Sequence, residues 1–362
     1  MTKLDRLHIT INSIIGFIGI VIGLIGIGVA PSIIVKILFA LLFLAGSGWF
    51  IKNISHFLRR LPSPYHLSKF VTPPDFVGRE TLLRNLNNSL KMTESLSLVG
   101  EQRMGKTSLL KTWQQQLQKT ARQVVFVDGS QTAASLPALI DAITQQNCSD
   151  DPEQAATILK EWGLETATST GLPPLLLIDE AEHFLEDIPL RFFERLRGML
   201  QEGQLVILFV TSREINRIFA DMEKTSPLSL RLLHLDLLEA SSRDSLIARG
   251  HFNPQQIELI KTWAGSHPYY LQLLGQCLIE ARQDGKNDEV ALRHFQTNAA
   301  ARFKKLQFNL TKKERQILQA ACQSEQKIQQ RSLIERGLVT EEGQLFGKVL
   351  LEWLIETGFE QD

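Results

Sequence analysis

The chain has 362 residues, which is enough for two or three modules of ordinary size. Its 39 basic and 39 acidic side chains cancel, so no overall charge attracts it to nucleic acid or to anionic lipid. The three cysteines lie far apart and form no C-x-x-C pair, which excludes a disulfide framework or zinc site of the usual spacing and fits a reducing compartment.

The N-terminal part of the chain is strongly apolar. Residues 9–30 carry no charge and are long enough to cross a hydrocarbon core of ~30 Å as a helix. Pro31 interrupts this run, and a second apolar run covers residues 33–51. Residues 1–52 therefore predict a two-helix transmembrane hairpin. A cleaved signal peptide is the alternative, but its apolar region would be shorter and no second span would follow.

The orientation of this hairpin follows from its flanking charges. Basic residues cluster before the first span and after the second, whereas only Lys36 lies near the turn. The positive-inside rule then places both termini in the cytoplasm, in a multi-pass protein of the inner or plasma membrane. Gly19 and Gly23 match a close-packing motif, which would serve packing between the two spans or self-association in the membrane.

Residues 53–75 contain four prolines and predict an extended, semi-rigid linker. The next segment reads F-V-G-R-E (residues 76–80) and precedes a helical run over residues 81–91. From local patterning alone, this segment indicates no more than the start of a helix.

Residues 100–107 read G-E-Q-R-M-G-K-T and match the phosphate-binding pattern G-x-x-x-x-G-K-[ST]. The pattern has the setting it requires, because an apolar strand (residues 95–99) precedes it and an amphipathic helix follows. Backbone N–H groups of such a loop surround a phosphate, and the positive helix end faces the anion. The predicted ATP-binding residues here are Gly100, Glu101, Gln102, Arg103, Met104, Gly105, Lys106, Thr107 and Ser108. Lys106 would reach the β- and γ-phosphates, and the Thr107 hydroxyl would bind Mg²⁺.

A second acidic motif follows farther along the chain. Residues 173–180 form an apolar run that ends in Asp179 and Glu180, as a Walker B strand does. Asp179 would lie beside Mg²⁺, and Glu180 would polarise the attacking water. The alternative is an acidic pair that merely caps the next helix, residues 181–190. The Asp–Glu pair also favours the class of P-loop ATPase with a strand inserted between the Walker motifs, and residues 123–128 supply that strand.

These motifs together resemble the archaeal-type and STAND (signal transduction ATPases with numerous domains) branch of AAA-like P-loop ATPases. The resemblance rests on the F-V-G-R-E box, the G-x-x-R-x-G-K-T-S-L-L loop, T-S-R at residues 211–213 and the G-S-H-P segment at residues 265–268. It implies that Phe76, Val77, Gly78 and Arg79 help hold adenine and ribose. It also implies that Arg213 contacts the γ-phosphate at the sensor 1 position, and that Pro268 lies against the base.

The resemblance also implies the fold. We expect an α/β parallel-sheet ATPase core over residues 76–250, with a fifth strand at residues 232–238. A helical lid over residues 251–305 and a winged helix over residues 306–362 would follow. The winged-helix segment carries seven basic and nine acidic side chains, so a surface that binds DNA is not favoured over a module packed on the ATPase.

The predicted function is a membrane-anchored ATPase that binds Mg-ATP, hydrolyses it slowly and acts as a nucleotide-dependent switch with a protein partner or with itself. Two alternatives stay open at this point. One is a DNA-binding protein of the replication-initiator or transposition-regulator kind. The other is a membrane scaffold that binds ATP without hydrolysing it.

Overall fold

The computed structural model describes residues 63–322 and 327–359, together with scattered positions between 18 and 47. The chain divides into two compact units, residues 1–64 with 278–290 and residues 65–277 with 291–362. Most of the predicted hairpin lies outside the described residues, and no helix built from described residues is long and apolar enough to cross a membrane. The hairpin therefore stays a prediction.

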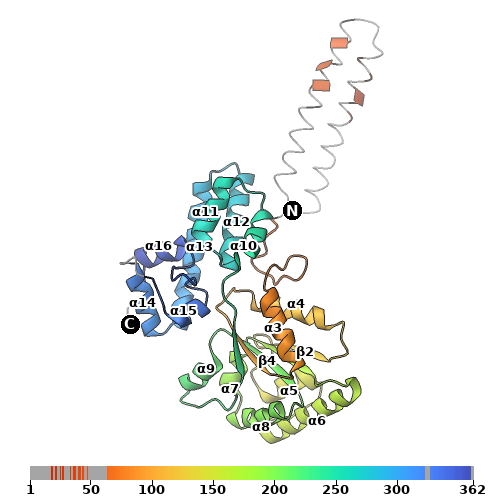
Figure 1. Cartoon of the computed structure of the whole chain (residues 1–362). Coiled ribbons are helices and arrows are strands. Elements are labelled where there is room, and N and C mark those ends of the chain that lie inside the picture. The colour runs from red at the N-terminus through yellow and green to blue at the C-terminus, as the bar shows by residue number, and fades with distance from the viewer. Residues whose placement is uncertain are drawn as a thin grey trace. The chain divides into compact units, whose positions relative to one another are not determined.

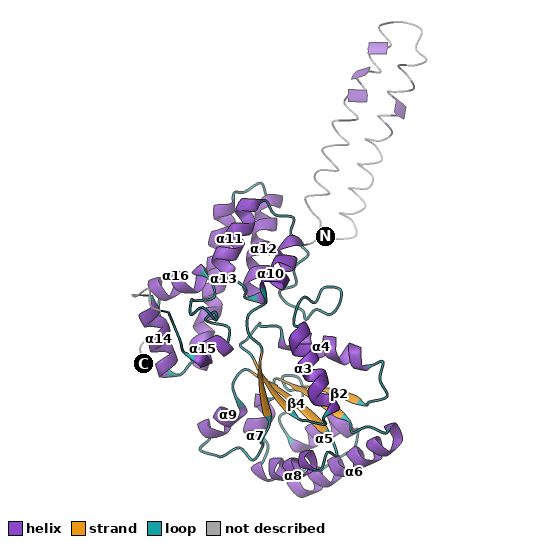
Figure 2. Ribbon diagram, in the orientation of Figure 1, coloured by secondary structure: helices purple, strands orange, loops and turns teal. Residues whose placement is uncertain are grey.

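The centre of the second unit is a parallel sheet with strand order β2-β3-β4-β1-β5 (Figure 2). Its strands are β1 (Leu96–Val99), β2 (Val124–Asp128), β3 (Leu175–Asp179), β4 (Val206–Thr211) and β5 (Arg231–His234). The predicted parallel-sheet core is confirmed. Strand β3 is buried at every position, as expected when helices cover both faces of a parallel sheet.

Two strand predictions need correction. The strand that separates the two Walker strands in space is β4, whereas the predicted strand, residues 123–128, forms β2 at the sheet edge. Sequence order did not reveal this, because connections in a parallel sheet cross over to non-adjacent positions. Strand β5 ends at His234 rather than at residue 238. Strand β1 turns into the phosphate loop after Val99, whose carbonyl accepts the Leu235 N–H at 2.8 Å, so no partner strand continues beyond that bond.

Helices cover the sheet on both sides (Figure 1). These helices are α3 (Glu80–Lys91), α4 (Lys106–Leu117), α5 (Leu136–Thr144), α6 (Pro152–Thr170), α7 (Glu182–Asp187), α8 (Leu190–Gln201) and α9 (Ile215–Asp221). The helix predicted over residues 181–190 is instead split into α7 and α8 around Pro189, which cannot continue a helix.

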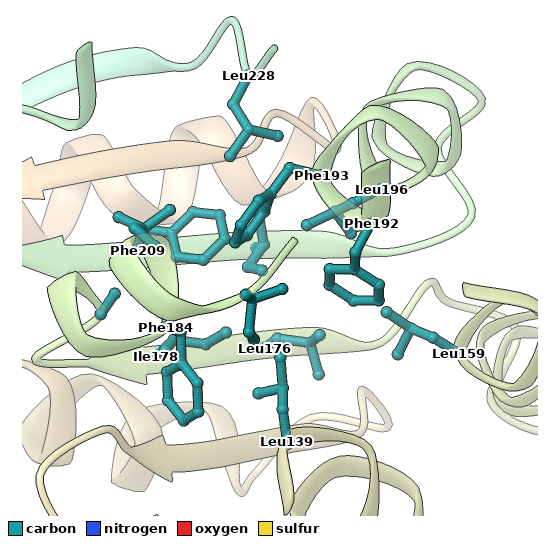
Figure 3. Packing of buried hydrophobic residues seen from close by; sticks show 14 of the residues in the cluster. Leu139, Leu159, Leu176, Ile178, Phe184, Phe192, Phe193, Leu196, Phe209 and Leu228 are labelled. Atoms are coloured by element: carbon teal, nitrogen blue, oxygen red, sulfur yellow. The ribbon is translucent and has the colours of Figure 1, made fainter. Parts of the chain in front are cut away.

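The two faces of the sheet bury alternate residues of each strand. On one face, Leu176 and Ile178 of β3 pack with Phe209 of β4 beneath Phe192 and Phe193 of α8 (Figure 3). On the other face, the intervening β3 and β4 residues pack against α3 and α4. This alternation is the period of two expected of a strand.

A helical segment follows the core. It comprises α10 (Ala240–Ala248), α11 (Pro254–Ala264), α12 (Pro268–Gln283) and α13 (Asp288–Leu306). Asn253 caps α11 with a full capping box, and Pro268 opens α12 at a position where no helical N–H is needed. Helices α11, α12 and all but the last residue of α13 fall within the residues predicted as the lid, whereas α10 precedes them, and the assignment as a lid stays a prediction.

The last elements are α14 (Lys312–Ala321), α15 (Arg331–Glu335) and α16 (Lys348–Glu356), which we call the C-terminal module. Between α15 and α16, Val339 and Leu345 form an isolated antiparallel bridge. Helix α16 packs against α11 and α14. The element order agrees with the expectation, and assignment as a winged helix stays a prediction.

Candidate functional site

The phosphate loop joins β1 to α4, so the first turn of α4 points its N–H groups toward the loop. Gly105 adopts φ 94°, and a Cβ there would meet nothing within 4 Å, so backbone conformation rather than space requires glycine. The Lys106 Nζ donates to the carbonyls of Gly100 at 2.8 Å and Glu101 at 3.3 Å. The ammonium is therefore held at the mouth of the loop, where it can exchange these carbonyls for phosphate oxygens.

Thr107 and Asp179 bring the two Walker motifs together. The Thr107 hydroxyl donates to Asp179 Oδ2 at 2.6 Å, although the residues are 72 positions apart. Asp179 is only 3 % exposed, and burial raises the pKa of its carboxyl despite the Thr107 bond. A hydroxyl and a buried carboxylate side by side are the hard oxygen ligands that Mg²⁺ prefers. Thr107 and Asp179 therefore fit the predicted metal site.

Glu180 follows at the end of β3 and lies on the exposed side of the site. Its backbone has φ 48°, in the left-handed region that a non-glycine residue rarely adopts. Burial raises the pKa of its carboxyl, and the neighbouring Asp179, Glu182 and Asp128 charges raise it further. A carboxylate with a raised pKa beside a metal site is suited to polarising or deprotonating water.

Helix termini and loops around these motifs enclose a cavity of about 740 Å³. Predicted residues from the box, the phosphate loop, Walker B, sensor 1 and the lid all line it. They are Phe76, Val77, Arg79, Gln102, Arg103, Met104, Gly105, Lys106, Thr107, Ser108, Asp179, Glu180, Arg213 and Pro268. Gly78, Gly100 and Glu101 do not line it. Gly78 instead lies against Ser242, where a Cβ would come within 2.6 Å of the hydroxyl oxygen.

The Arg79 guanidinium is bound by backbone carbonyls of the protein itself, although its predicted role is to help hold adenine and ribose. Its guanidinium donates to the Asp236 carbonyl at 2.7 Å and to the Leu237 carbonyl at 3.0 Å. It also approaches the Met104 carbonyl at 3.5 Å. Burial lowers the pKa of this side chain. Arg79 thus ties the box to the chain after β5 and to the phosphate loop, while it lines one edge of the cavity.

Sensor 1 lies at the carboxyl end of β4. Arg213 forms ion pairs with Glu186 and Asp221, each at 2.7 Å. The Ser212 hydroxyl donates to Glu182 at 2.7 Å. Arg213 lines the cavity, but it would have to exchange at least one carboxylate partner to contact a γ-phosphate.

Two other arginines, Arg217 and Arg231, pair with carboxylates outside the cavity. Arg217 lies 3.9 Å from Glu314 of the C-terminal module, and Arg231 pairs with Glu94 at 3.2 Å. Neither lines the cavity.

Several cavity residues were not predicted from the sequence. Tyr269 follows Pro268 at the start of α12, and the guanidinium carbons of Arg103 and Arg302 each lie 5.7 Å from its ring centre. Gln272 and Asn309 also line the cavity. Of these residues, only Tyr269 could have been suggested from the sequence, because it is an aromatic residue next to Pro268. Arg302 and Asn309 could not, because they reach the site only through the packing of α13.

Comparison with known proteins agrees with this geometry. Residues 91–219 match a protein family described as an AAA domain. No protein of curated function matches the chain.

Among solved structures, the chain is similar to a Walker-type ATPase of Pyrococcus abyssi, with a TM-score of 0.57 and 16 % identity over 81 % of this chain and 99 % of that one. It is more distantly similar to Drosophila ORC bound to DNA, with a TM-score of 0.47 and 15 % identity over 75 % and 72 % of the two chains. For the Aeropyrum pernix Orc1 protein in complex with DNA, the TM-score is 0.41, with 14 % identity over 68 % and 72 %.

At 16 % identity, the likeness to the Pyrococcus protein shows a shared fold. The family match covers both Walker motifs and the sheet strands from β1 to β4. Together with the strand order and the Thr107–Asp179 contact, these findings show an AAA-like P-loop fold in this part of the chain.

Proposed function

We propose that this protein binds Mg-ATP, hydrolyses it slowly and uses the two nucleotide states as a switch. The observation that carries the proposal is the convergence of Lys106, Thr107, Asp179 and Glu180 at one cavity. Each has the chemistry that its motif requires, and residues from two Walker motifs far apart in sequence meet there.

The chain's own groups account for the main steps. The N–H groups of the phosphate loop and the Lys106 ammonium bind the phosphates and orient the γ-phosphate. Thr107 and Asp179 would hold Mg²⁺, and the ion would supply positive charge to neutralise the phosphate oxygens. Glu180 polarises the attacking water. Arg213 adds positive charge when it exchanges a carboxylate partner for the γ-phosphate.

Membrane anchoring belongs to the same proposal. It is supported by the two long apolar runs within residues 9–51 and by the basic residues that flank them. The ATPase would then face the cytoplasm, where its nucleotide is found. The acidic balance of residues 306–362 favours a protein partner or self-association as the switch output over DNA.

The test is single-turnover ATP hydrolysis by the purified full chain in detergent, beside Lys106→Ala and Glu180→Gln. We expect wild type to hydrolyse ATP and both variants to lose at least ~100-fold in rate. Glu180→Gln should still bind ATP, since it keeps the phosphate loop, whereas Lys106→Ala should bind it weakly. Hydrolysis at the wild-type rate by Glu180→Gln would reject the assigned role of this carboxylate. Tight ATP binding without turnover by wild type would favour the scaffold alternative.

A further inference from the structure

The phosphate loop contains an acidic residue, Glu101, directly after its first glycine. Its side chain is 6 % exposed and does not line the nucleotide cavity. A carboxylate in a loop that binds a triphosphate is electrostatically unfavourable, since like charges repel strongly where water is excluded. The loop therefore needs a cation that neutralises Glu101.

Arg336, at the end of α15 in the C-terminal module, supplies this cation. Its Nε donates to Glu101 Oε2 at 3.1 Å, and a second guanidinium nitrogen contacts the same oxygen. The third nitrogen donates to the Asn309 carbonyl at 2.8 Å, and the Asn309 amide donates to Glu101 Oε1 at 3.2 Å. Both carboxylate oxygens are thus engaged by the segment that leads into the C-terminal module and by the module itself.

The other side of Arg336 faces a second carboxylate. Glu314 of α14 lies 3.8 Å from Arg336 and accepts a 2.7 Å hydrogen bond from Ser332. Arg217 of α9 lies 3.9 Å from the same Glu314 oxygen. The result is an alternating row of two acidic and two basic side chains that runs from the phosphate loop through the C-terminal module to α9.

Helix α9 carries both Arg217, the last residue of this row, and Asp221, which contacts a residue of the nucleotide site. Its Asp221 holds the sensor 1 residue Arg213 at 2.7 Å. The C-terminal module therefore contacts the phosphate loop through Arg336, and through Arg217 it also contacts the helix whose Asp221 pairs with Arg213.

The Met104 side chain of the phosphate loop also packs against the backbone of the C-terminal module at Gly337. Gly337 has φ 70°, and a Cβ on it would lie 2.8 Å from the Met104 Cε of the phosphate loop. Met104 is 1 % exposed. Glu101 and Met104 thus stand at two variable positions of the phosphate loop. They contact Arg336 and Gly337, two successive residues of the C-terminal module.

Buried ion pairs contribute little net stability compared with apolar packing, but removal of one partner leaves an uncompensated charge. We propose that Arg336 is a positioning residue that neutralises Glu101, so that ATP affinity depends on the docking of the C-terminal module onto the phosphate loop. The inference rests on the proposed function and names its regulation. By thermodynamic linkage, ATP then stabilises the docked module to the same extent as docking strengthens ATP binding.

The test is a double-mutant cycle on the full chain, with the dissociation constant of Mg-ATP measured by titration calorimetry in the Glu180→Gln background to prevent turnover. Arg336→Gln is expected to weaken ATP binding at least ~10-fold, because it leaves a buried negative charge without its cation in the loop that binds the phosphates. Glu101→Gln alone leaves the Arg336 cation without its carboxylate partner near the phosphate loop, and this positive charge is expected to tighten binding a few-fold. The double variant should bind within about threefold of the parent.

Recovery of ATP affinity in the double variant distinguishes charge neutralisation by Arg336 from a merely structural role. If Arg336 only held the module together, Glu101→Gln would not restore the affinity that Arg336→Gln loses, and the double variant would bind as weakly as Arg336→Gln. Should Arg336→Gln fail to fold, Glu101→Gln still decides, since it keeps the Arg336–Glu314 contact. Unchanged or weaker binding by Glu101→Gln overturns the proposal.

Arg331→Gln is the matched control. Arg331 lies on the same helix, is 89 % exposed at its side chain and pairs with Glu335 outside this row of charges. Its removal should leave ATP affinity unchanged. If the parent itself binds no ATP, the proposed function fails; if it binds ATP but the cycle shows no rescue, this inference alone fails.

Discussion

The buried carboxylate of Asp179 is suited to binding a cation, but its burial lowers the stability of the folded protein. The structure buries its carboxylate at 3 % exposure, and the pKa rises above the ordinary value of 3.8 because of that burial. Because the pKa of the Asp179 carboxyl is higher in the folded protein, the protonated side chain contributes stability that is fully present below pH 3.8. This stability is lost as the pH rises through the pKa of the folded state. At neutral pH the ionised Asp179 therefore destabilises the protein when no cation is bound.

We predict that Asp179→Asn raises the free energy of unfolding at pH 7 in the absence of divalent cations. The amide keeps an acceptor for the Thr107 hydroxyl but carries no charge. The gain should vanish below pH 3.8, where the aspartate is protonated in both states. Urea unfolding at several pH values, with EDTA present, measures this difference. A variant less stable than wild type at pH 7 would show that the carboxylate is already compensated within the protein.

At the scale of elements, neighbouring strand ends hold the backbone of Asp179 and Glu180 in place. Strand β2 ends at Asp128, and the next N–H, from Gly129, donates to the Asp179 carbonyl at 2.9 Å. A Cβ on Gly129 would lie 2.4 Å from the Glu180 carbonyl oxygen. The close approach of two backbones, rather than a turn, requires glycine at this position.

We predict that Gly129→Ala displaces the Glu180 backbone, because a Cβ cannot lie 2.4 Å from a carbonyl oxygen. Single-turnover hydrolysis should fall at least ~10-fold, because small displacements of a positioned group are costly in catalysis. ATP affinity should change less, since the phosphate loop is untouched. Gly198→Ala in α8 is the control, because a Cβ there meets nothing within 4 Å. Equal effects of the two substitutions would contradict the assigned role of Gly129.

At the scale of the whole molecule, an aromatic cluster joins the helical segment to the C-terminal module. The ring of His267, just before α12, lies 4.5 Å from the Tyr270 ring and 5.0 Å from the Phe346 ring, centre to centre. Burial, with a smaller effect of the nearby Arg79 charge, lowers the pKa of His267 to about 3. The imidazole is therefore neutral in the folded protein, and its Nδ1 accepts the Tyr269 N–H at 3.3 Å.

This histidine predicts acid sensitivity. Between its ordinary value of 6.5 and about 3, the unfolded chain binds the proton that the folded protein excludes, so stability falls as the pH falls. The loss between pH 7 and pH 5 should be about 2 kcal/mol. His267→Asn keeps an acceptor for the Tyr269 N–H and cannot titrate, so its stability should change less over this interval. Denaturant unfolding of both proteins at pH 7 and pH 5 measures the effect. Equal losses would assign the acid sensitivity to other groups.

Much of the site could be predicted because its motifs are local. Gly105, Lys106 and Thr107 need only a strand before them and a helix after them, and Asp179 needs only an apolar strand that ends at a carboxylate. These requirements are written in adjacent residues, and periodicity located the strands and helices around them. The ends of elements were less predictable, as the early end of β5 at His234 shows, because they depend on where a partner strand stops.

By itself, then, the sequence determined the class of fold, the phosphate loop and the acidic strand end, since each follows from short-range chemistry. Only the tertiary structure decided that β4 separates the Walker strands and that Arg213 is held by two carboxylates. It also decided that Arg336 meets Glu101 across 235 positions of the chain. Such contacts depend on how helices pack over the sheet, and a buried charge finds its partner through that packing rather than through any spacing along the chain.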